Sequence, residues 1–386
     1  DIKVVTGNGT DTIGIVSPFA WASTHRLTLD AALNVDIKAP MTVQGTAGLT
    51  IVTSNGETGG DLMFYRGGKI DFWDTGSSLI INRASYTLIS TVPELGHAIK
   101  RATRHNRFAL SQDYDATHDK FRRSPVGEKF LGIFEGLGHS ISNLTIASTG
   151  DDECVGLFSG TVYWQHQGIL RDIILHNANV SASAPYGSAG TLVGCSGGII
   201  LYAASDGRVV ENGASGTAGG LAGNAYYISR SHANVAVTAG LIAGGLMGKG
   251  NAFQSYALGP VSGTSDNAEV GGLAGSGQCS QSFATGNVTG GTNSAAGGLI
   301  GGSGDADNSY ASGSVTGGEG SRVGGLLGYS NGPWVVESYS TGNVSGGDNS
   351  IVGGFGGQIL DSVGLNLNYW DLDTSGTSKN CGVGSC

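Results

Sequence analysis

The sequence predicts an all-β fold, a parallel β-helix whose coils are about 26 residues long. Three observations carry this prediction. The phrase Gly-Gly-Leu-x-Gly, or a close variant, occurs six times from Gly219 to Gly357, and successive copies begin 25, 27, 26, 27 and 29 residues apart. A second phrase, Ser-aromatic-Ala/Ser, recurs with the same period and begins at Ser255, Ser282, Ser309 and Ser338. No stretch of these repeats keeps a helical apolar pattern for three turns, so each unit is predicted to consist of short strands.

Composition narrows the class of protein further. The chain has 386 residues with 69 glycines, 7 prolines and no three-residue glycine period, which excludes a collagen-like fold. Hydrophobic residues make up 39%, which is too many for a disordered Gly/Ser linker. The net charge of −10 argues against a nucleic-acid partner. No apolar run approaches the roughly 18–20 residues of a membrane span, so we expect no transmembrane segment.

Residues 1–92 are predicted to form the first coils of the solenoid. Short apolar or alternating runs in this region read as strands, and turn clusters such as Ser54-Asn-Gly and Arg66-Gly-Gly separate them. The runs are Leu27–Leu29, Val35–Ile37, Leu49–Val52, Leu62–Phe64, Ile70–Trp73 and Leu79–Ile81.

Residues 93–129 interrupt the strand pattern. A short helix is predicted from Pro93 to about His105, because proline and an acid open it and bases close it. Its apolar face is expected to comprise Leu95, Ala98, Ile99 and Ala102. A polar loop follows to about Lys129. We expect this helix to pack against the solenoid and to cover an edge or an end of its core.

Residues 130–386 are predicted to continue the β-helix, with like residues stacked above like in three interior ladders. The paired glycines are expected to take positive φ at corners and to leave room where backbones approach closely. The ladders are a leucine ladder (Leu221, Leu246, Leu273, Leu299, Leu326 and Phe355), an aromatic ladder (Tyr256, Phe283, Tyr310 and Tyr339) and a valine ladder (Val261, Val288, Val315 and Val344).

The glycine phrases, together with the run from Phe134 to Ile146, resemble the GLUG repeat of bacterial secreted proteins. Residues 27–120 are similar to exoproteins of the filamentous-haemagglutinin, two-partner-secretion type, and Asn368–Gly376 resembles the close of a GLUG array. The resemblance implies a right-handed β-helix, export through an outer-membrane transporter of a Gram-negative bacterium, and a role in adhesion or matrix building. It implies no shared catalytic residues.

The basic segment between Lys100 and Lys129 is the first candidate site, because it holds eight of the chain's 20 lysines and arginines. Such a cluster suits an acidic polysaccharide, and local charge pairing on a solvated cap is the simpler interpretation. The ligand-binding residues would be Arg101, Arg104, Arg107, Arg122 and Arg123. If the protein is a lyase or glycosidase, the catalytic residues would be Asp113, Asp115, Arg104 and Lys100.

Two other pairs of residues are weaker candidates. Trp73 beside Asp74 suits a sugar platform, because aromatic rings stack on sugars, although the same motif also reads as structural. Asp371 and Asp373 open a calcium-loop pattern, but its twelfth position, residue 382, is glycine, so a terminal turn is the better interpretation. We expect no cofactor, since neither a His-Glu-x-x-His motif nor a phosphate-binding loop occurs.

The five cysteines fit no zinc-binding spacing. Cys381 and Cys386 are close enough to form a disulfide that clips the C-terminal end. Cys154, Cys195 and Cys279 are interpreted as small buried hydrophobic residues, with no pairing assigned.

These observations favour a secreted or surface-exposed β-helix of a Gram-negative bacterium that binds host, matrix or other glycans as an adhesin or structural protein. Any export signal would have been removed or would lie outside this sequence. A β-helix enzyme acting on polysaccharides is the alternative. A third possibility is a fibre subunit that associates end to end through unpaired strands.

Overall fold

The computed structural model describes residues 1–7, 9, 11–54, 59–102, 106–162, 168–332, 334–360 and 362–384, with the side chain of Glu128 left out. The chain is an all-β parallel solenoid of about 13 turns, with roughly 28 residues per turn and two small helices. The predicted fold class is therefore confirmed, with a slightly longer coil and one helix more than expected. The coils form two compact units, which we describe separately. The first unit comprises residues 1–116, 131–142 and 169–174, and the second comprises the rest of the chain.

In the first unit, strands stack in parallel, as in the register Leu27↔Leu49, and β10 and β11 form an antiparallel pair. One group of paired strands comprises β1 (Ile2–Val5), β4 (Arg26–Asp30), β7 (Gly48–Val52), β10 (Ser78–Ile81), β11 (Ala84–Ile89), β12 (Arg107–Leu110), β15 (Ile133–Glu135) and β20 (Ile169–Arg171). The others are β2 (Ile13–Ile15), β5 (Val35–Ile37) and β8 (Leu62–Phe64); β3 (Phe19–Trp21), β6 (Met41–Val43) and β9 (Ile70–Phe72); and β13 (Tyr114–Asp115) and β16 (Ser140–Ser142).

The core of the first unit is a continuous set of buried aliphatic and aromatic side chains from these strands. Leu49, Ile51 and Ile70 are fully buried within it. Alternating residues of each strand point inward, which is why the apolar runs of residues 27–81 could be read as strands.

Helix α1 (Val92–Arg101) begins where the sequence predicts a helix. Thr91 caps it by accepting a hydrogen bond from the Glu94 amide at 3.2 Å, and the Glu94 carboxylate accepts one from the Ser90 amide at 2.9 Å. This reciprocal pattern is a capping box shifted by one residue, and it satisfies amides that the helix itself leaves unpaired. The buried face comprises Val92, Leu95 and Ile99.

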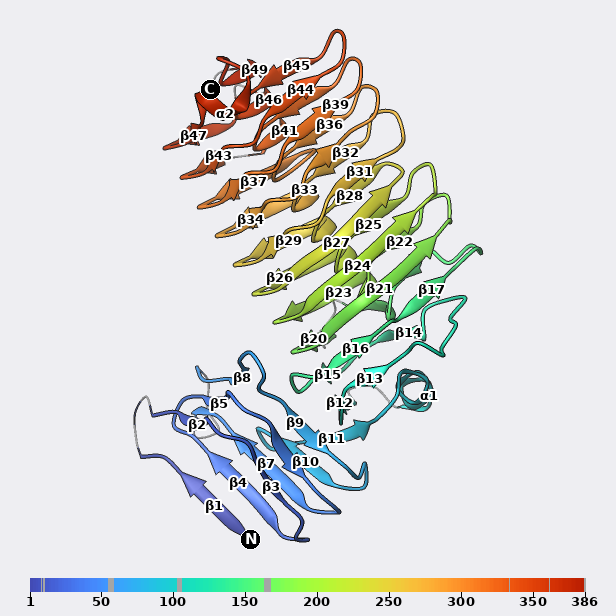
Figure 1. Cartoon of the computed structure of the whole chain (residues 1–386), viewed down its shortest axis with the longest axis vertical. Coiled ribbons are helices and arrows are strands. Elements are labelled where there is room, and N and C mark those ends of the chain that lie inside the picture. Colours follow the sequence, from blue (N-terminus) through green and yellow to red (C-terminus); the bar gives the residue numbers. More distant parts are fainter. Residues whose placement is uncertain are drawn as a thin grey trace. The chain divides into compact units, whose positions relative to one another are not determined.

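The second unit carries three sheets, A to C, which run along the stack of coils, and a short additional group (Figure 1). From β30 on, sheet B has two short strands in each coil. Sheet A comprises β14 (Val126–Phe130), β19 (Phe158–Thr161), β23 (Val193–Leu201), β26 (Ala222–Ser229), β29 (Met247–Phe253), β33 (Ala274–Ser280), β37 (Gly304–Asp307), β42 (Trp334–Val336) and β47 (Gly364–Asn366). The additional group is β41 (Leu327–Ser330), β46 (Gly356–Ile359) and β49 (Cys381–Val383).

Sheet B comprises β17 (Thr145–Ala147), β21 (Ile174–Ala182), β24 (Ala204–Glu211), β27 (His232–Ala239), β30 (Tyr256–Ala257), β31 (Val261–Gly263), β34 (Phe283–Ala284), β35 (Val288–Thr289), β38 (Tyr310–Ala311), β39 (Val315–Gly317), β43 (Tyr339–Ser340), β44 (Val344–Gly346) and β48 (Tyr369–Trp370). Sheet C comprises β18 (Cys154–Val155), β22 (Ser188–Ala189), β25 (Thr217–Gly219), β28 (Ile242–Gly244), β32 (Glu269–Gly271), β36 (Ala295–Gly297), β40 (Arg322–Gly324) and β45 (Ile351–Gly353).

The predicted leucine and valine ladders lie in the interior of the second unit. Leu246, Leu273 and Leu299 are fully buried. The amide of Leu246 donates to the Leu273 carbonyl, and that of Leu273 donates to the Leu299 carbonyl, each at 2.9 Å. Val288 is buried and pairs with Val261 on one side and Val315 on the other. Each coil therefore adds apolar burial worth about 1.5–3 kcal/mol per leucine and extends the backbone hydrogen-bond network.

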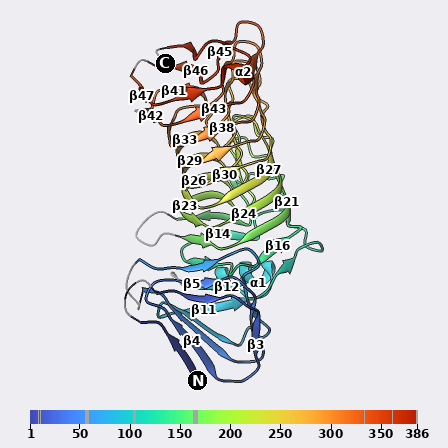
Figure 2. The ribbon, with the colours of Figure 1, turned by 60° about the vertical axis from the view of Figure 1, so that its left-hand side comes forward.

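The aromatic ladder was expected inside, and this expectation is wrong. The strands of this ladder follow one another along sheet B, among them β30 and β38 (Figure 2). Their rings, those of Tyr256, Phe283 and Tyr310, are partly exposed and point outward, whereas the small residues that follow them, such as Ala284, are fully buried. Adjacent rings stack with centroids 4.8 Å apart and interplanar angles of 3–4°. The narrow interior accepts only a small side chain here, so the larger residue of each two-residue strand lies outside.

The glycines of the repeated phrase allow the backbones of neighbouring coils to approach closely. They were also expected to take positive φ at corners, and this expectation is wrong. A Cβ on Gly272 would lie 2.0 Å from the Gly298 carbonyl oxygen of the next coil. The left-handed corner before each serine phrase is instead formed by non-glycine residues, including Gln254 (φ 48°), Gln281 (φ 49°) and Asn308 (φ 47°).

The serines after these corners form a hydrogen-bonded ladder. The Ser255 amide donates to Ser282 Oγ and the Ser282 amide donates to Ser309 Oγ, each at 3.1 Å across one coil of 27 residues. Ser282 Oγ in turn donates to the Ser280 carbonyl at 2.7 Å. Ser282 is 1% exposed, so its recurrence has a structural cause: it satisfies buried backbone groups at each corner.

The interpretation of the internal cysteines needs a correction. Cys154 and Cys195 form a disulfide across 41 residues of sequence, whereas Cys279 is a buried free thiol, as expected. The spacing of Cys154 and Cys195 gave no sign of the bond, because the solenoid brings them together across neighbouring coils. Of the predicted terminal pair, Cys381 lies on β49 and Cys386 falls outside the described residues.

Candidate functional site

A groove with a volume of about 410 Å³ opens on sheet A of the second unit. Its lining residues come from β26, β29, β33, β37 and β42, one strand from each of five successive coils. Figure 1 shows the first four of these strands following one another along the stack. The groove therefore runs across the strands, along the direction in which the coils stack.

One row of side chains in this groove occupies the same position in every coil. Asn251 pairs with Gln278 and Gln278 pairs with Asp305. The register Ile228↔Ala252 places Tyr227 next to Asn251, and Ala306↔Val335 places Trp334 next to Asp305. We call Tyr227, Asn251, Gln278, Asp305 and Trp334 the polar row; it consists of two amides and a carboxylate with an aromatic ring at each end.

A second row lies two residues further along the same strands. Phe253 pairs with Ser280, and Ser280 with Asp307. Because side chains alternate along a strand, the residue between the two rows points inward. These inward residues are apolar and buried, and they comprise Ile228, Ala252, Cys279, Ala306 and Val335.

Hydrogen bonds between coils hold both carboxylates of the groove in place. Gln278 Nε2 donates to Asp305 Oδ2 at 3.0 Å, and Ser280 Oγ donates to Asp307 Oδ2 at 3.0 Å. The Asp305 side chain is largely buried, since the residue is only 7% exposed, whereas Gln278 is exposed and Trp334 is 59% exposed. A rigid buried acid thus lies between a solvent-facing amide and a solvent-facing indole.

Two glycines next to the polar row determine the local backbone conformation. Gly250 and Gly277 precede Asn251 and Gln278 and have φ values of 145° and 137°, a region that other residues avoid. A Cβ on Gly277 would also lie 1.9 Å from the Gly250 carbonyl oxygen. Glycine at this position therefore keeps successive coils close together under the groove.

The chemistry of the groove suits a polyhydroxylated ligand. Carboxylates and amides bind hydroxyl groups with defined geometry, and exposed aromatic faces pack on the apolar faces of sugar rings. The described lining residues include no lysine or arginine, so the groove does not suit a phosphate or sulfate group.

A separate charged cluster lies in the first unit around Asp113. Lys69 Nζ is 2.8 Å from Asp113 and 3.4 Å from Asp71, and Nδ1 of the fully buried His139 is 3.4 Å from Asp113. The His139 ring beside it, followed by the hydrogen bond from Lys69, lowers the pKa of the Asp113 carboxyl well below its usual range. Burial alone would lower the pKa of Lys69, but its bond to Asp113 and the charge of Asp71 raise it. Lys69 and Asp113 stabilise each other's charges, and Asp113 is a poor general base in this state.

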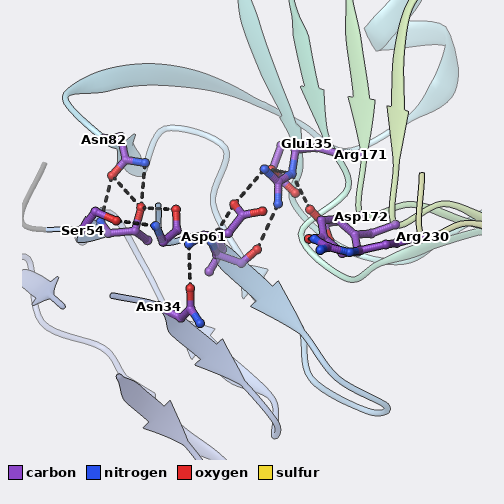
Figure 3. A network of polar contacts seen from close by, with 12 residues as sticks. Asn34, Ser54, Asp61, Asn82, Glu135, Arg171, Asp172 and Arg230 are labelled. Atoms are coloured by element: carbon purple, nitrogen blue, oxygen red, sulfur yellow. Dashed lines mark hydrogen bonds and ion pairs between the residues drawn. The ribbon is translucent and has the colours of Figure 1, made fainter. Parts of the chain in front are cut away.

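A second cluster of the first unit surrounds Arg171 (Figure 3). Its Nε lies 3.2 Å from Glu135 and 2.6 Å from Asp172, and its Nη1 lies 3.0 Å from Asp61. One guanidinium thus faces three carboxylates. Burial, and then the charge of Asp172, raises the pKa of Glu135, while burial raises the pKa of Asp172 to about 6. Arg171 Nη2 also donates a hydrogen bond to the Leu62 carbonyl at 3.0 Å. A guanidinium bound on all sides in this way is typical of a structural ion-pair network. We therefore infer that this cluster stabilises the stacking of the coils.

The residues of the predicted basic site are divided between the two units. Lys100 and Arg101 are exposed in the last turn of α1, and Arg107 lies half-buried on β12, all in the first unit. Arg122 and Arg123 are exposed in the second unit. Arg104 lies outside the described residues, and Asp115 is exposed on β13.

Of the remaining predicted sites, Trp73 is 68% exposed, whereas Asp74 folds back to accept a hydrogen bond from the Gly76 amide at 2.7 Å. Asp74 is therefore a turn residue. Asp371 caps the one-turn helix α2 (Leu372–Ser375) and accepts from the Asp373 amide at 2.9 Å, as expected for a terminal turn. Within the described ranges, no group of three or more His, Cys, Asp or Glu side chains is placed to hold a metal ion.

The groove was not found from the sequence, because no candidate site residue was assigned on the outward face of the glycine-phrase repeats. A signal was present in the residues after each glycine phrase. Gly248, Gly275 and Gly301 are constant, whereas the polar-row positions that follow them vary between amide and carboxylate. Variable polar residues at a fixed outward position of a constant frame are typical of a binding surface.

No protein-family model matches the chain. A 133-residue region is 33% identical to halomucin of Haloquadratum walsbyi; it covers 31% of this chain and 1% of that protein. Among solved structures, a protein of Bacteroides ovatus provisionally named as an immunoglobulin A1 protease is 24% identical, with a TM-score of 0.49, over 60% of this chain and 77% of that one. Among the described residues, neither helix has the length and apolar character needed to cross a bilayer.

Proposed function

We propose that this chain is an extracellular β-solenoid that binds carbohydrate in the groove of sheet A. The polar row carries the proposal: two amides and a fixed carboxylate between Tyr227 and Trp334, on a rigid face that repeats once per coil. Extended surfaces of stacked repeats are well suited to binding extended ligands.

The disulfide between Cys154 and Cys195 supports the extracellular location. Structural disulfides form and persist mainly in oxidising compartments, including the periplasm and the cell exterior. Adhesion to host or matrix glycans at the surface of a Gram-negative bacterium, after export through an outer-membrane transporter, is the specific role suggested by the resemblance to GLUG-repeat exoproteins.

The test is retention of the protein in native gels containing soluble polysaccharides. Trp334→Ala removes the exposed indole of the groove, and Trp73→Ala is the matched control, because Trp73 is similarly exposed but lies in the first unit. We expect at least one polysaccharide to retard the wild-type protein and the control, and to retard Trp334→Ala much less. Equal retardation of both variants would place the binding surface elsewhere.

A hydrolytic enzyme is the second candidate, and a specific observation favours it. Asp305 and Asp307 leave the same face of β37 two residues apart, or about 6.6 Å along a strand. That spacing is at the lower end of the range for the two carboxyl groups of inverting glycosidases. Release of reducing ends that stops in both Asp305→Asn and Asp307→Asn would support this function.

A further inference from the structure

The charge of the groove points to a particular class of glycan. Asp305 and Asp307 place two carboxylates on its wall, and no described lining residue is a lysine or arginine. Lys249, on the adjoining part of β29, is basic but is not among the residues that line the groove. Burial raises the pKa of Glu269 on sheet C, and the charges of Lys249 and Arg322 oppose this shift.

We propose that the groove takes an uncharged polysaccharide, lying along the stack of coils with about one sugar ring per coil, and rejects acidic glycans. This inference rests on the proposed function and specifies the ligand of the same site. It differs from the acidic polysaccharide expected from the basic segment of residues 100–129.

The spacing of the coils determines the direction in which the polysaccharide is expected to lie. Rings on neighbouring coils of sheet B are 4.8–5.0 Å apart, which gives the spacing of the coils and is close to the length of one pyranose ring. The polar row presents one side chain per coil at this spacing. An extended polysaccharide parallel to the row therefore places one sugar ring against the polar-row side chain of each coil. A polysaccharide lying across the row would contact the polar row in only one coil.

The chemistry of each position agrees with neutral sugars. Gln278 uses one N–H on Asp305 and keeps its carbonyl oxygen and second N–H for a ligand. The Asp307 carboxylate, which is more exposed than that of Asp305, can accept hydrogen bonds from sugar hydroxyls, and such bonds to charged acceptors are strong. Tyr227 and Trp334 provide a ring surface at each end of the row, where the chain would enter and leave.

The same carboxylates oppose an acidic ligand. Asp305 is nearly buried and its hydrogen bond to Gln278 fixes its position, so the carboxylate cannot move away from an incoming uronate or sulfate. Like charges brought together in a partly desolvated groove are strongly unfavourable, and this repulsion provides discrimination against acidic chains.

The experiment measures affinity for a neutral glucan or mannan panel and for polyuronates of matched length. It uses the wild-type chain, Asp305→Asn/Asp307→Asn, and the control Asp151→Asn/Asp152→Asn, which removes the same charge from another part of the second unit. We expect the wild type and control to bind a neutral glycan at least about tenfold more tightly than any polyuronate. The groove variant should bind polyuronates better and the neutral glycan less well. Asn retains an acceptor for Gln278 and Ser280, and a matching urea midpoint would verify its fold.

The outcomes separate this inference from the proposed function. Polyuronate binding that equals or exceeds neutral binding and requires Trp334 would overturn the inference and leave carbohydrate binding intact. Absence of binding to either class would overturn both. A length series of the bound neutral oligosaccharide provides the second readout: affinity should rise with each ring up to about five rings, one for each strand of the groove, and then level off. A plateau at one or two rings would contradict the axial orientation.

Discussion

Gln278 on β33 donates a hydrogen bond to Asp305 on β37 at 3.0 Å, and this bond joins two adjacent coils within the groove. The two side chains are thereby fixed before a ligand arrives. Little side-chain entropy is then lost on binding, which favours affinity from few contacts. The groove is thus a consequence of the repeat, because the same coil-to-coil register that aligns the core also aligns the polar row.

The serine ladder should contribute measurably to stability. Ser282→Ala removes the acceptor for the buried Ser255 amide, so we expect a loss of about 1–3 kcal/mol in the free energy of unfolding. Urea unfolding followed by circular dichroism measures this loss. Thr289→Ala, at an exposed position of β35, is the control and should change stability by less than about 0.5 kcal/mol. A Ser282→Ala variant as stable as this control would show that the ladder is not needed.

The leucine ladder should tolerate no charge. Leu273→Asp places a carboxylate without a partner in the interior, and we expect destabilisation of about 4 kcal/mol or more, or failure to fold. Asn267→Asp adds the same charge at an exposed residue with φ 62°, a conformation that aspartate also accepts. Thermal unfolding of the two variants gives the comparison, and similar midpoints would contradict the interior assignment.

The internal disulfide should stabilise the coils that it joins. For a loop closed across 41 residues, chain entropy suggests about 4 kcal/mol. We therefore expect a reductant to lower the urea midpoint of the wild type more than that of Cys154→Ser/Cys195→Ser, which already lacks this bond. If the reductant lowers the urea midpoints of both proteins equally, the bond between Cys154 and Cys195 does not account for the stabilisation.

The Arg171 cluster predicts a pH dependence with a definite sign. Because the pKa values of Glu135 and Asp172 are raised in the folded chain, the native state binds more protons than the unfolded state above pH about 4. The contribution of this pair to stability is therefore greatest below pH 4 and falls as the pH rises through about 6. Glu135→Gln removes one acid and should weaken this fall.

The measurement compares the unfolding free energies of wild type and Glu135→Gln at pH 4 and pH 7. The test uses the difference in unfolding free energy between the two proteins. Asp113 and Asp206 have lowered pKa values, so in both proteins they oppose the loss of stability with rising pH. Parallel pH profiles for wild type and variant would contradict the assigned coupling.

The solenoid could be predicted from the sequence because the residues that recur in each coil are those that the core requires. Leu273 must be apolar and Gly272 must lack a Cβ, so both recur visibly. The orientation of Tyr256 and its stacked neighbours was not predictable in this way. In a strand of two residues, alternation allows either one to face inward, and the width of the interior decides between them.

The candidate site was less predictable for a related reason. Asn251, Gln278 and Asp305 are chemically different residues, so no motif connects them, and only the coil register reveals that they lie in one row. The basic segment was conspicuous in the sequence because its charges are close together along the chain. The fold divides those charges between two units, whereas it gathers residues of the groove that lie more than 100 positions apart, from Tyr227 to Trp334.

The most direct test of carbohydrate binding along the polar row is calorimetric titration of a neutral five-ring oligosaccharide into the wild type, Tyr227→Ala and Trp334→Ala. Each variant should lose about tenfold in affinity, or 1.4 kcal/mol, because the ligand spans both aromatic ends. A two-ring fragment should be affected by at most one of the two substitutions. Five-ring affinity that is unchanged in both variants would contradict the account.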